Sequence, residues 1–246
     1  MQKILNGVKN IAYFIMTMSL LVMAACSSQP VVTESTGEVT DVEQGRAFSA
    51  LVCEGTNDTL LVFLRTPYDG HDPDTLNVLQ ANKNHRVYGL PNVGDNVMVL
   101  PCIEDSTQVE VVIVVEDLIG RWGYEAHPTL RQRAGMSTDT ISLPDTIKAL
   151  LRVAREYSID LKSDHTMLAF GVGRSHMYDE SPVEYPRMKR YSAWRIVDDC
   201  LLMSVSATDS TGQRVVTGVD TAHFVMLTPD TLVLNINGTI QGYGKK

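Results

Sequence analysis

The stretch "TPDTLVLNI", residues 228–236, decides the fold that the sequence predicts for the C-terminal half of the chain. Leu232, Leu234 and Ile236 alternate with Val233 and Asn235. A period of two places the first three side chains on one face of a β-strand and the others on the opposite face. The polar turn "TPD" leads into this strand. The segment therefore predicts a half-buried antiparallel strand.

The same pattern occurs further upstream. Ile159 and Leu161 alternate with polar residues, and Met167 and Ala169 follow on a second apolar face. Short polar turns, "SDH" and "VDD", separate these strands from their neighbours. Such turns suit an up-and-down antiparallel sheet that closes on itself. We therefore expect an all-β fold with a β-barrel over residues 118–246.

Four pieces of this half resemble, in order and spacing, the lipocalin-like domains found in lipoproteins of Gram-negative bacteria. They are a GxW motif, Gly120-Arg121-Trp122, then "YSIDLKSDHTMLAFGVGRS" (157–175), "YSAWRIVDDCLLMSV" (191–205) and the closing segment 220–246. The resemblance implies an up-and-down barrel over residues 118–246 with Trp122 plugging its floor. An ordinary core tryptophan would be buried in the same way, so the sequence leaves both interpretations open.

One insertion interrupts the barrel pattern. In "SLPDTIKALLRVAREY", residues 142–157, apolar residues follow a helical spacing from Ile147 to Ala154, and Ser142 with Asp145 forms a weak capping box. We expect a short helix packed outside the barrel or over one mouth. The alternative is a strand that continues through Val153 to Tyr157.

Residues 46–117 predict a separate small β-domain. Five strand-like segments follow one another: 46–55, 59–66, 84–90, 95–103 and 108–117. A long segment between the second and third, "PYDGHDPDTLNVLQANK" (67–83), is expected to be irregular. Five strands in this length suit a small five-stranded barrel of the OB or SH3-like kind. The segment "ANKNHRVYGLPNVGDNV" (81–97) also resembles the small barrel that often precedes lipocalin-like domains.

The N-terminus predicts export and lipid attachment. Lys3 and Lys9 precede an uncharged apolar run, residues 11–25, which is too short to span a membrane. Ala24-Ala25-Cys26 resembles the lipobox of bacterial lipoproteins, in which the cysteine is acylated and the chain is cleaved just before it. The resemblance implies a lipoprotein signal peptide over 1–25, lipidation of Cys26 with acyl chains such as palmitate, and an outer membrane lipoprotein that faces the periplasm or the cell surface. An ordinary secretory signal is the alternative.

Residues 26–45 are rich in Ser, Thr, Glu and Val without a helical period, which predicts a flexible tether. The chain carries 21 Lys and Arg against 29 Asp and Glu, a net charge of −8, and loss of residues 1–25 would remove two of the positive charges. Because phosphate binding needs a basic face, nucleic acid is not an expected partner. The membrane is expected as a partner through the lipid alone.

Metal binding has little support in the sequence, whereas one disulfide is left open. Cys53 and Cys102 could form a disulfide in an oxidising envelope, whereas Cys200 is expected to be a lone thiol. No CxxC spacing is present, and the scattered histidines match no ligand spacing. The acidic segment "DGHDPD", 69–74, is expected to be a solvated turn rather than a calcium loop. We therefore expect neither a metal nor a cofactor.

The sequence favours binding over catalysis. It contains no GxSxG, SxxK or HExxH motif, so a non-enzymatic protein is expected. Aromatic and Met residues gather in the loop "RSHMYDESPVEYPRMKRY" (174–191), which suits a ligand site at a barrel rim. The candidate ligand-binding residues are Trp122, Met177, Tyr178, Tyr185, Tyr191 and Trp194.

The sequence supports two hypotheses for the function. The first is a lipid-anchored envelope protein whose lipocalin-like barrel binds a small, partly apolar ligand or a partner protein. The alternative is a structural or assembly lipoprotein with a filled barrel and no ligand. A cavity of a few hundred Å³ inside the barrel would favour the first, and interdigitated core side chains would favour the second.

Overall fold

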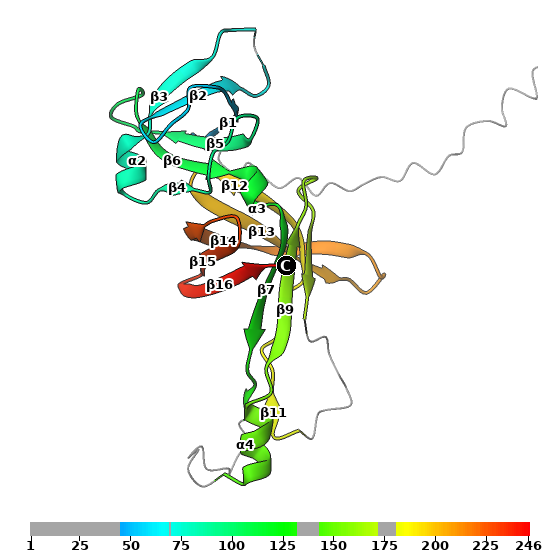
Figure 1. Cartoon of the computed structure of the whole chain (residues 1–246). Coiled ribbons are helices and arrows are strands. Elements are labelled where there is room, and N and C mark those ends of the chain that lie inside the picture. Colours follow the sequence, from blue (N-terminus) through cyan, green and yellow to red (C-terminus); the bar gives the residue numbers. More distant parts are fainter. Residues whose placement is uncertain (1–44, 69, 132–142, 172–180) are drawn as a thin grey trace, which may run out of the picture. The chain divides into compact units, whose positions relative to one another are not determined.

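The computed structural model describes residues 45–246 except Asp69, 132–142 and 172–180. The predicted signal peptide, Cys26 and the tether therefore lie outside the described residues, as do Met177 and Tyr178. Residues Gln44–Lys246 form one compact unit. Most of this unit is β-structure, arranged in two large sheets and one small one (Figure 1).

Eight strands form the larger sheet, in the order β10-β9-β7-β16-β15-β14-β13-β12. Their bounds are β7 (Gly120–Ala126), β9 (Arg155–Leu161), β10 (Met167–Phe170), β12 (Tyr191–Val197), β13 (Cys200–Thr208), β14 (Arg214–Leu227), β15 (Thr231–Ile236) and β16 (Thr239–Lys245). The strands pair antiparallel in chain order from β7 through β9 to β10 and from β12 through β13, β14 and β15 to β16, and β16 returns to pair with β7.

The eight-stranded sheet curls round until its two outer strands, β10 and β12, nearly meet. An antiparallel bridge joins Thr166 to Ala193, and the Trp194 amide donates a hydrogen bond of 2.8 Å to the His165 carbonyl. An up-and-down barrel of eight strands results, which confirms the predicted all-β fold class.

The alternation that predicted these strands is also what closes the barrel. Leu161, Met167, Leu232 and Leu234 are all buried, as the period of two requires. Ile159 is buried beside them, while Asp160 and Leu168 between these positions are only partly covered. Because β9, β10 and β15 each carry apolar side chains on one face, closing the sheet removes those side chains from water.

The insertion between β7 and β9 forms a small extension. It contains β8 (Thr129–Leu130), which pairs with β11 (Val183–Glu184), and the helix α4 (Asp145–Leu151). The predicted helix is present, but it is shorter than the apolar spacing indicated, because β9 begins at Arg155. Ser142 of the expected capping box lies outside the described residues, and the helix starts after Pro144 without a side-chain cap. Figure 1 shows α4 beside β11, and no residue of α4 is fully buried.

The smaller sheet has the order β3-β2-β1-β5-β6-β4, one strand more than predicted. Its elements are β1 (Phe48–Val52), β2 (Leu60–Arg65), β3 (Asp74–Asn77), α2 (Leu79–Lys83), β4 (Val87–Tyr88), β5 (Asn96–Pro101), β6 (Val109–Val114) and α3 (Val115–Leu118). The expectation of an irregular segment over 67–83 is wrong, because β3 and α2 lie there. Only Leu76 of β3 packs against the core, too little to give a visible alternation.

Two further features concern residues outside the barrel. Cys53 and Cys102 are free thiols, so the disulfide that the sequence allowed is absent between these described residues. The helices of the described part of the chain are all too short, or too polar, to cross a membrane.

Both sheets contribute to one hydrophobic cluster. Leu100, Val111 and Ile113 of the smaller sheet belong to the same buried group as Trp122 and Phe224 of the barrel. The Gly89 amide also donates a 3.0 Å hydrogen bond to the Leu227 carbonyl. Along the chain, the strands of the smaller sheet end with β6 and those of the larger sheet begin with β7. Side chains from both sheets nevertheless pack in the same hydrophobic core.

Candidate functional site

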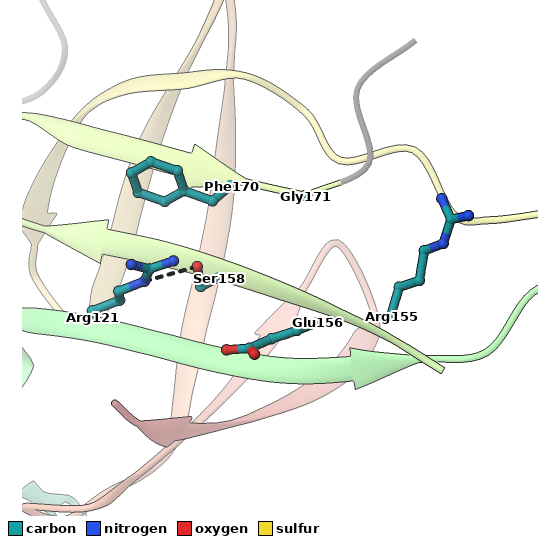
Figure 2. Close-up of a pocket in the computed structure, with 6 residues that line it drawn as sticks. All are labelled: Arg121, Arg155, Glu156, Ser158, Phe170 and Gly171. Carbon is teal, nitrogen blue, oxygen red and sulfur yellow. Dashed lines mark hydrogen bonds between the residues drawn. The ribbon is translucent and has the colours of Figure 1, made fainter. Parts of the chain in front are cut away.

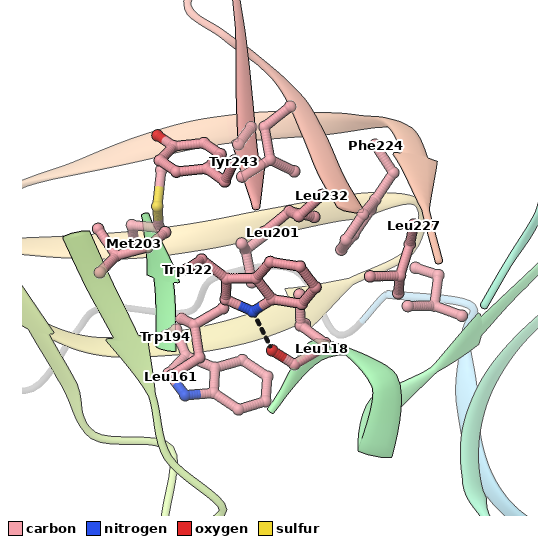
Figure 3. Close-up of a cluster of buried hydrophobic side chains, with 14 of the residues drawn as sticks. Leu118, Trp122, Leu161, Trp194, Leu201, Met203, Phe224, Leu227, Leu232 and Tyr243 are labelled. Atoms are coloured by element: carbon pink, nitrogen blue, oxygen red, sulfur yellow. Dashed lines mark hydrogen bonds between the residues drawn. The ribbon is translucent and has the colours of Figure 1, made fainter. Parts of the chain in front are cut away.

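The interior of the barrel is occupied by its own side chains. Trp122 is 0% exposed and Trp194 is 2% exposed. Each indole has a backbone acceptor: Trp122 Nε1 donates to the Leu118 carbonyl at 2.8 Å, and Trp194 Nε1 donates to the Lys162 carbonyl at 3.0 Å. Figure 3 shows Trp122 surrounded by large apolar neighbours from most strands of the barrel. The buried group around it includes Leu161, Leu201, Met203, Phe224, Leu232 and Tyr243.

A polar network lies near the start of β12 and the end of β15. Asp220 is 6% exposed and accepts hydrogen bonds from Lys189 Nζ (2.6 Å), the Tyr191 hydroxyl (2.9 Å) and Asn237 Nδ2 (3.1 Å). Burial alone would raise the pKa of Asp220, but these hydrogen bonds and the charge of Lys189 outweigh burial and lower it. Burial and the bond to Asp220 raise the pKa of Tyr191. The Tyr191 hydroxyl thus has an internal structural partner.

The other aromatic candidates lie apart from one another. The Tyr185 hydroxyl donates to the Val153 carbonyl at 2.8 Å, and the guanidinium carbon of Arg155 lies 4.0 Å from the centre of its ring. Tyr191 lines a small pocket of about 170 Å³, whose other residues are Arg190 just before β12, two residues of β10, the last three of β13 and the first of β14. The structure places Trp122 and Trp194 in the core and does not bring Tyr185 to them. Tyr191 packs against the core cluster that contains both tryptophans, whereas the contacts of Tyr185 are with Val153 and Arg155.

A larger pocket, of about 440 Å³, is open to solvent on the outer face of β7, β9 and β10 (Figure 2). It faces outward because Trp122 and its cross-strand partner Ile159 point into the barrel, so that Arg121 and Ser158 next to them point away. The residues that line it are Arg121, Arg155, Glu156, Ser158, Phe170 and Gly171.

Arg121 is held in place by two contacts. Its Nε donates a 3.1 Å hydrogen bond to Ser158 Oγ, and its guanidinium carbon lies 4.7 Å from the centre of the Phe170 ring. The ring contact is a cation–π interaction, which orients the flat guanidinium group. Neither contact uses the Nη groups, which are the atoms that bind a carboxylate or phosphate in a two-pronged manner.

The charge balance of the pocket favours an anion. Arg121 and Arg155 line it with a single acid, Glu156, whose carboxylate pairs with Lys246 Nζ at 3.2 Å. Phe170 is 42% exposed and supplies an apolar surface beside Arg121, whereas Arg155 lies at the other end of the pocket, with its guanidinium group over the Tyr185 ring (Figure 2). This arrangement can hold a small anion that carries an apolar group.

Gly171 lets β10 end close to the barrel wall. A Cβ atom at this position would lie 2.5 Å from Cδ1 of Tyr157, which is too close for two non-bonded carbon atoms. A side chain would force the end of β10 away from β9 and change the pocket beside Phe170. Neither this glycine nor Arg121, Arg155, Ser158 and Phe170 was a candidate from sequence. Their outward positions become visible only once β7, β9 and β10 are placed in register.

Comparisons with known proteins give one structural match. No protein-family model matches the chain, and no curated protein does. Among solved structures, the crystal structure of a lipocalin-like protein from Bacteroides thetaiotaomicron matches with 16% sequence identity and a TM-score of 0.29. The match covers 52% of this chain and 96% of that one. The fold assignment rests on the strand order and the closure of the sheet.

Proposed function

We propose that this chain is a lipid-anchored, non-enzymatic envelope protein whose barrel is a packed scaffold and whose outer pocket binds a small anion with an apolar group. The stacking of Arg121 on the exposed Phe170 ring, in a pocket that Arg155 also lines, carries this proposal. It keeps the binding role expected from the sequence and moves it from the barrel interior to the barrel wall.

The filled interior supports a scaffold rather than a ligand carrier. A buried ligand would need to displace several of the side chains around Trp122, each of which already has close neighbours. Removing such contacts costs several kcal/mol, roughly 2–5 for one large aliphatic side chain. An external pocket requires no such rearrangement.

The strand pairing of the smaller sheet supports the proposal that residues 46–117 form an OB-like barrel, which comes between Cys26 and the larger barrel along the chain. β1 pairs antiparallel with β2 and β5, β5 pairs with β6, and α2 follows β3 directly. A parallel bridge from Asn77 to Gln108 brings the β3 edge to the start of β6, which is the closure that such a barrel needs. With the acidic composition of the chain, a spacer or protein-contact role suits this part better than nucleic-acid binding.

The pocket is tested with benzoate as the probe, since it combines a carboxylate with an apolar ring. We expect saturable, weak binding to the purified full chain by ligand-observed NMR, because the probe is small. Arg121→Ala should weaken it about ten- to a hundredfold, the effect of losing one charge-assisted hydrogen-bonding group. Benzyl alcohol, which lacks the charge, should bind more weakly than benzoate.

The matched control is Arg195→Ala, which removes an exposed arginine from β12, on another part of the barrel. This variant should bind benzoate as the wild type does. Absence of saturable binding, or equal binding by the Arg121→Ala variant, would rule out the pocket as the binding site.

A further inference from the structure

Three potential metal ligands meet at the turn between β12 and β13. The ligand atoms of Asp199, Cys200 and His223 all lie within 4.8 Å of one another. Cys200 Sγ is 3.3 Å from His223 Nδ1 and 3.3 Å from Asp199 Oδ1. A thiol, an imidazole and a carboxylate are the three side-chain types that bind Zn²⁺.

The strand register places this cluster on the outer face of the barrel. Cys200 is paired with His223 on β14, and His223 is paired with Asn235 on β15. The residues next to them in sequence, Leu201 and Ala222, are buried in the core. Cys200 and His223 therefore face away from the core, and His223 is exposed to solvent.

We propose that Asp199, Cys200 and His223 form a Zn²⁺ site with three protein ligands and an open fourth position. With zinc–ligand bonds of about 2.0–2.3 Å, neighbouring ligand atoms of a tetrahedral site lie about 3.3–3.6 Å apart. The two 3.3 Å separations at Cys200 Sγ fall at this spacing. The site is independent of the anion pocket and does not rest on the proposed function.

A second observation at the same place points to a bound group. Asn235 Oδ1 is buried and has no hydrogen-bond partner in the described part of the chain. A buried acceptor without a partner is costly, by roughly 1–3 kcal/mol. Asn235 lies opposite His223 on the next strand, so its amide oxygen can accept a hydrogen bond from a water at the open zinc position.

Arg86 orients the carboxylate ligand. Its Nη2 lies 3.1 Å from Asp199 Oδ2 and 3.6 Å from Glu110 Oε1. Since Oδ2 is engaged by Arg86, the other oxygen, Oδ1, is the one near Cys200. This is the second layer of contacts that fixes ligand geometry in metal sites.

The thiol keeps its proton until a metal arrives. Burial, the hydrogen bond to Asp199 and the negative charges of Asp199 and Asp198 raise the pKa of Cys200 to about 12. Zinc binding converts this thiol to a zinc-bound thiolate and releases one proton to water. The charged or titratable groups around the sulfur are Asp198, Asp199, His223 and, through Asp199, Arg86.

The test uses the full chain, reduced, freed of metal with a chelator and then titrated with Zn²⁺ against a chromophoric competitor. We expect one high-affinity Zn²⁺ per chain. Cys200→Ser should weaken this affinity at least about a hundredfold and His223→Gln at least about tenfold, since each removes one of three ligands. Because His223 is exposed, its substitution should leave the fold intact.

Co²⁺ in place of Zn²⁺ gives an absorption signal that depends on the bond between the metal and Cys200. A purely structural role of Cys200 would not produce this signal. A thiolate–cobalt bond produces a charge-transfer absorption band, which should appear in the wild type and disappear in Cys200→Ser. Cys53→Ser, which removes another half-buried free thiol, is the matched control and should retain both the band and the zinc affinity. A wild type that binds no zinc tightly, or a band that survives Cys200→Ser, would overturn the proposal.

Discussion

Replacing Trp122 with alanine is expected to lower the free energy of unfolding by about 3–5 kcal/mol, a large share of the 5–15 kcal/mol typical of a folded domain. The side chain is fully buried, and its Nε1 donates the 2.8 Å hydrogen bond to Leu118. Its removal opens a cavity at the cluster that joins both sheets, and leaves the Leu118 carbonyl without its indole donor (Figure 3). Equilibrium unfolding in urea measures the change.

Two further variants make this measurement specific. Trp122→Phe keeps much of the buried ring and loses the indole donor, so its effect should be smaller than that of alanine. Tyr68→Ala removes an aromatic ring that is 65% exposed, and should change stability by no more than about 0.5 kcal/mol. If Trp122→Ala costs less than about 1 kcal/mol, the interior is not packed around this residue.

Replacing Cys26 with serine is expected to abolish lipid attachment completely. The lipobox resemblance makes the Cys26 thiol the acyl acceptor, and a serine hydroxyl cannot form the same thioether. Each buried methylene contributes about 0.8 kcal/mol, so that two or three acyl chains hold a protein permanently where one holds it only marginally. Metabolic labelling with tagged palmitate, together with the intact mass of the purified protein, measures the effect.

The wild type should incorporate the label and have the mass of a chain that begins at Cys26 plus its acyl groups. Cys26→Ser should incorporate none. Cys53→Ser changes a cysteine of the folded part and should be labelled as the wild type is. Label retained by Cys26→Ser, or absent from the wild type, would remove the lipid anchor from the proposed function.

The regular part of the fold was predictable because it depends on local alternation. Leu232, Leu234, Ile159 and Met167 each stand in a period of two, and all four are buried in the barrel. The expected helix near Ile147 is also present. The strand β3 was missed because Leu76 is its one residue packed against the core, so a four-residue edge strand leaves no pattern to detect.

The candidate sites were not predictable because they depend on pairing between distant segments. Arg121 and Ser158 are 37 residues apart and meet through the register of β7 and β9. Cys200 and His223 are 23 residues apart, a spacing that matches no metal motif, and β13–β14 pairing brings them together. Conversely, aromatic content alone could not show that Trp122 and Trp194 face the core while Tyr185 lies elsewhere.

We propose that the barrel interior is filled by its own side chains and that a ligand binds outside it. The chain has two tryptophans, Trp122 and Trp194, and both lie inside the barrel, so tryptophan fluorescence reports on that interior. Titration of the full chain with oleate, followed by tryptophan emission and by acrylamide quenching, is the most direct test. A filled barrel predicts emission typical of buried indoles, weak quenching and no saturable response to oleate. A saturable change in emission would show that the ligand enters the interior, and would contradict this account.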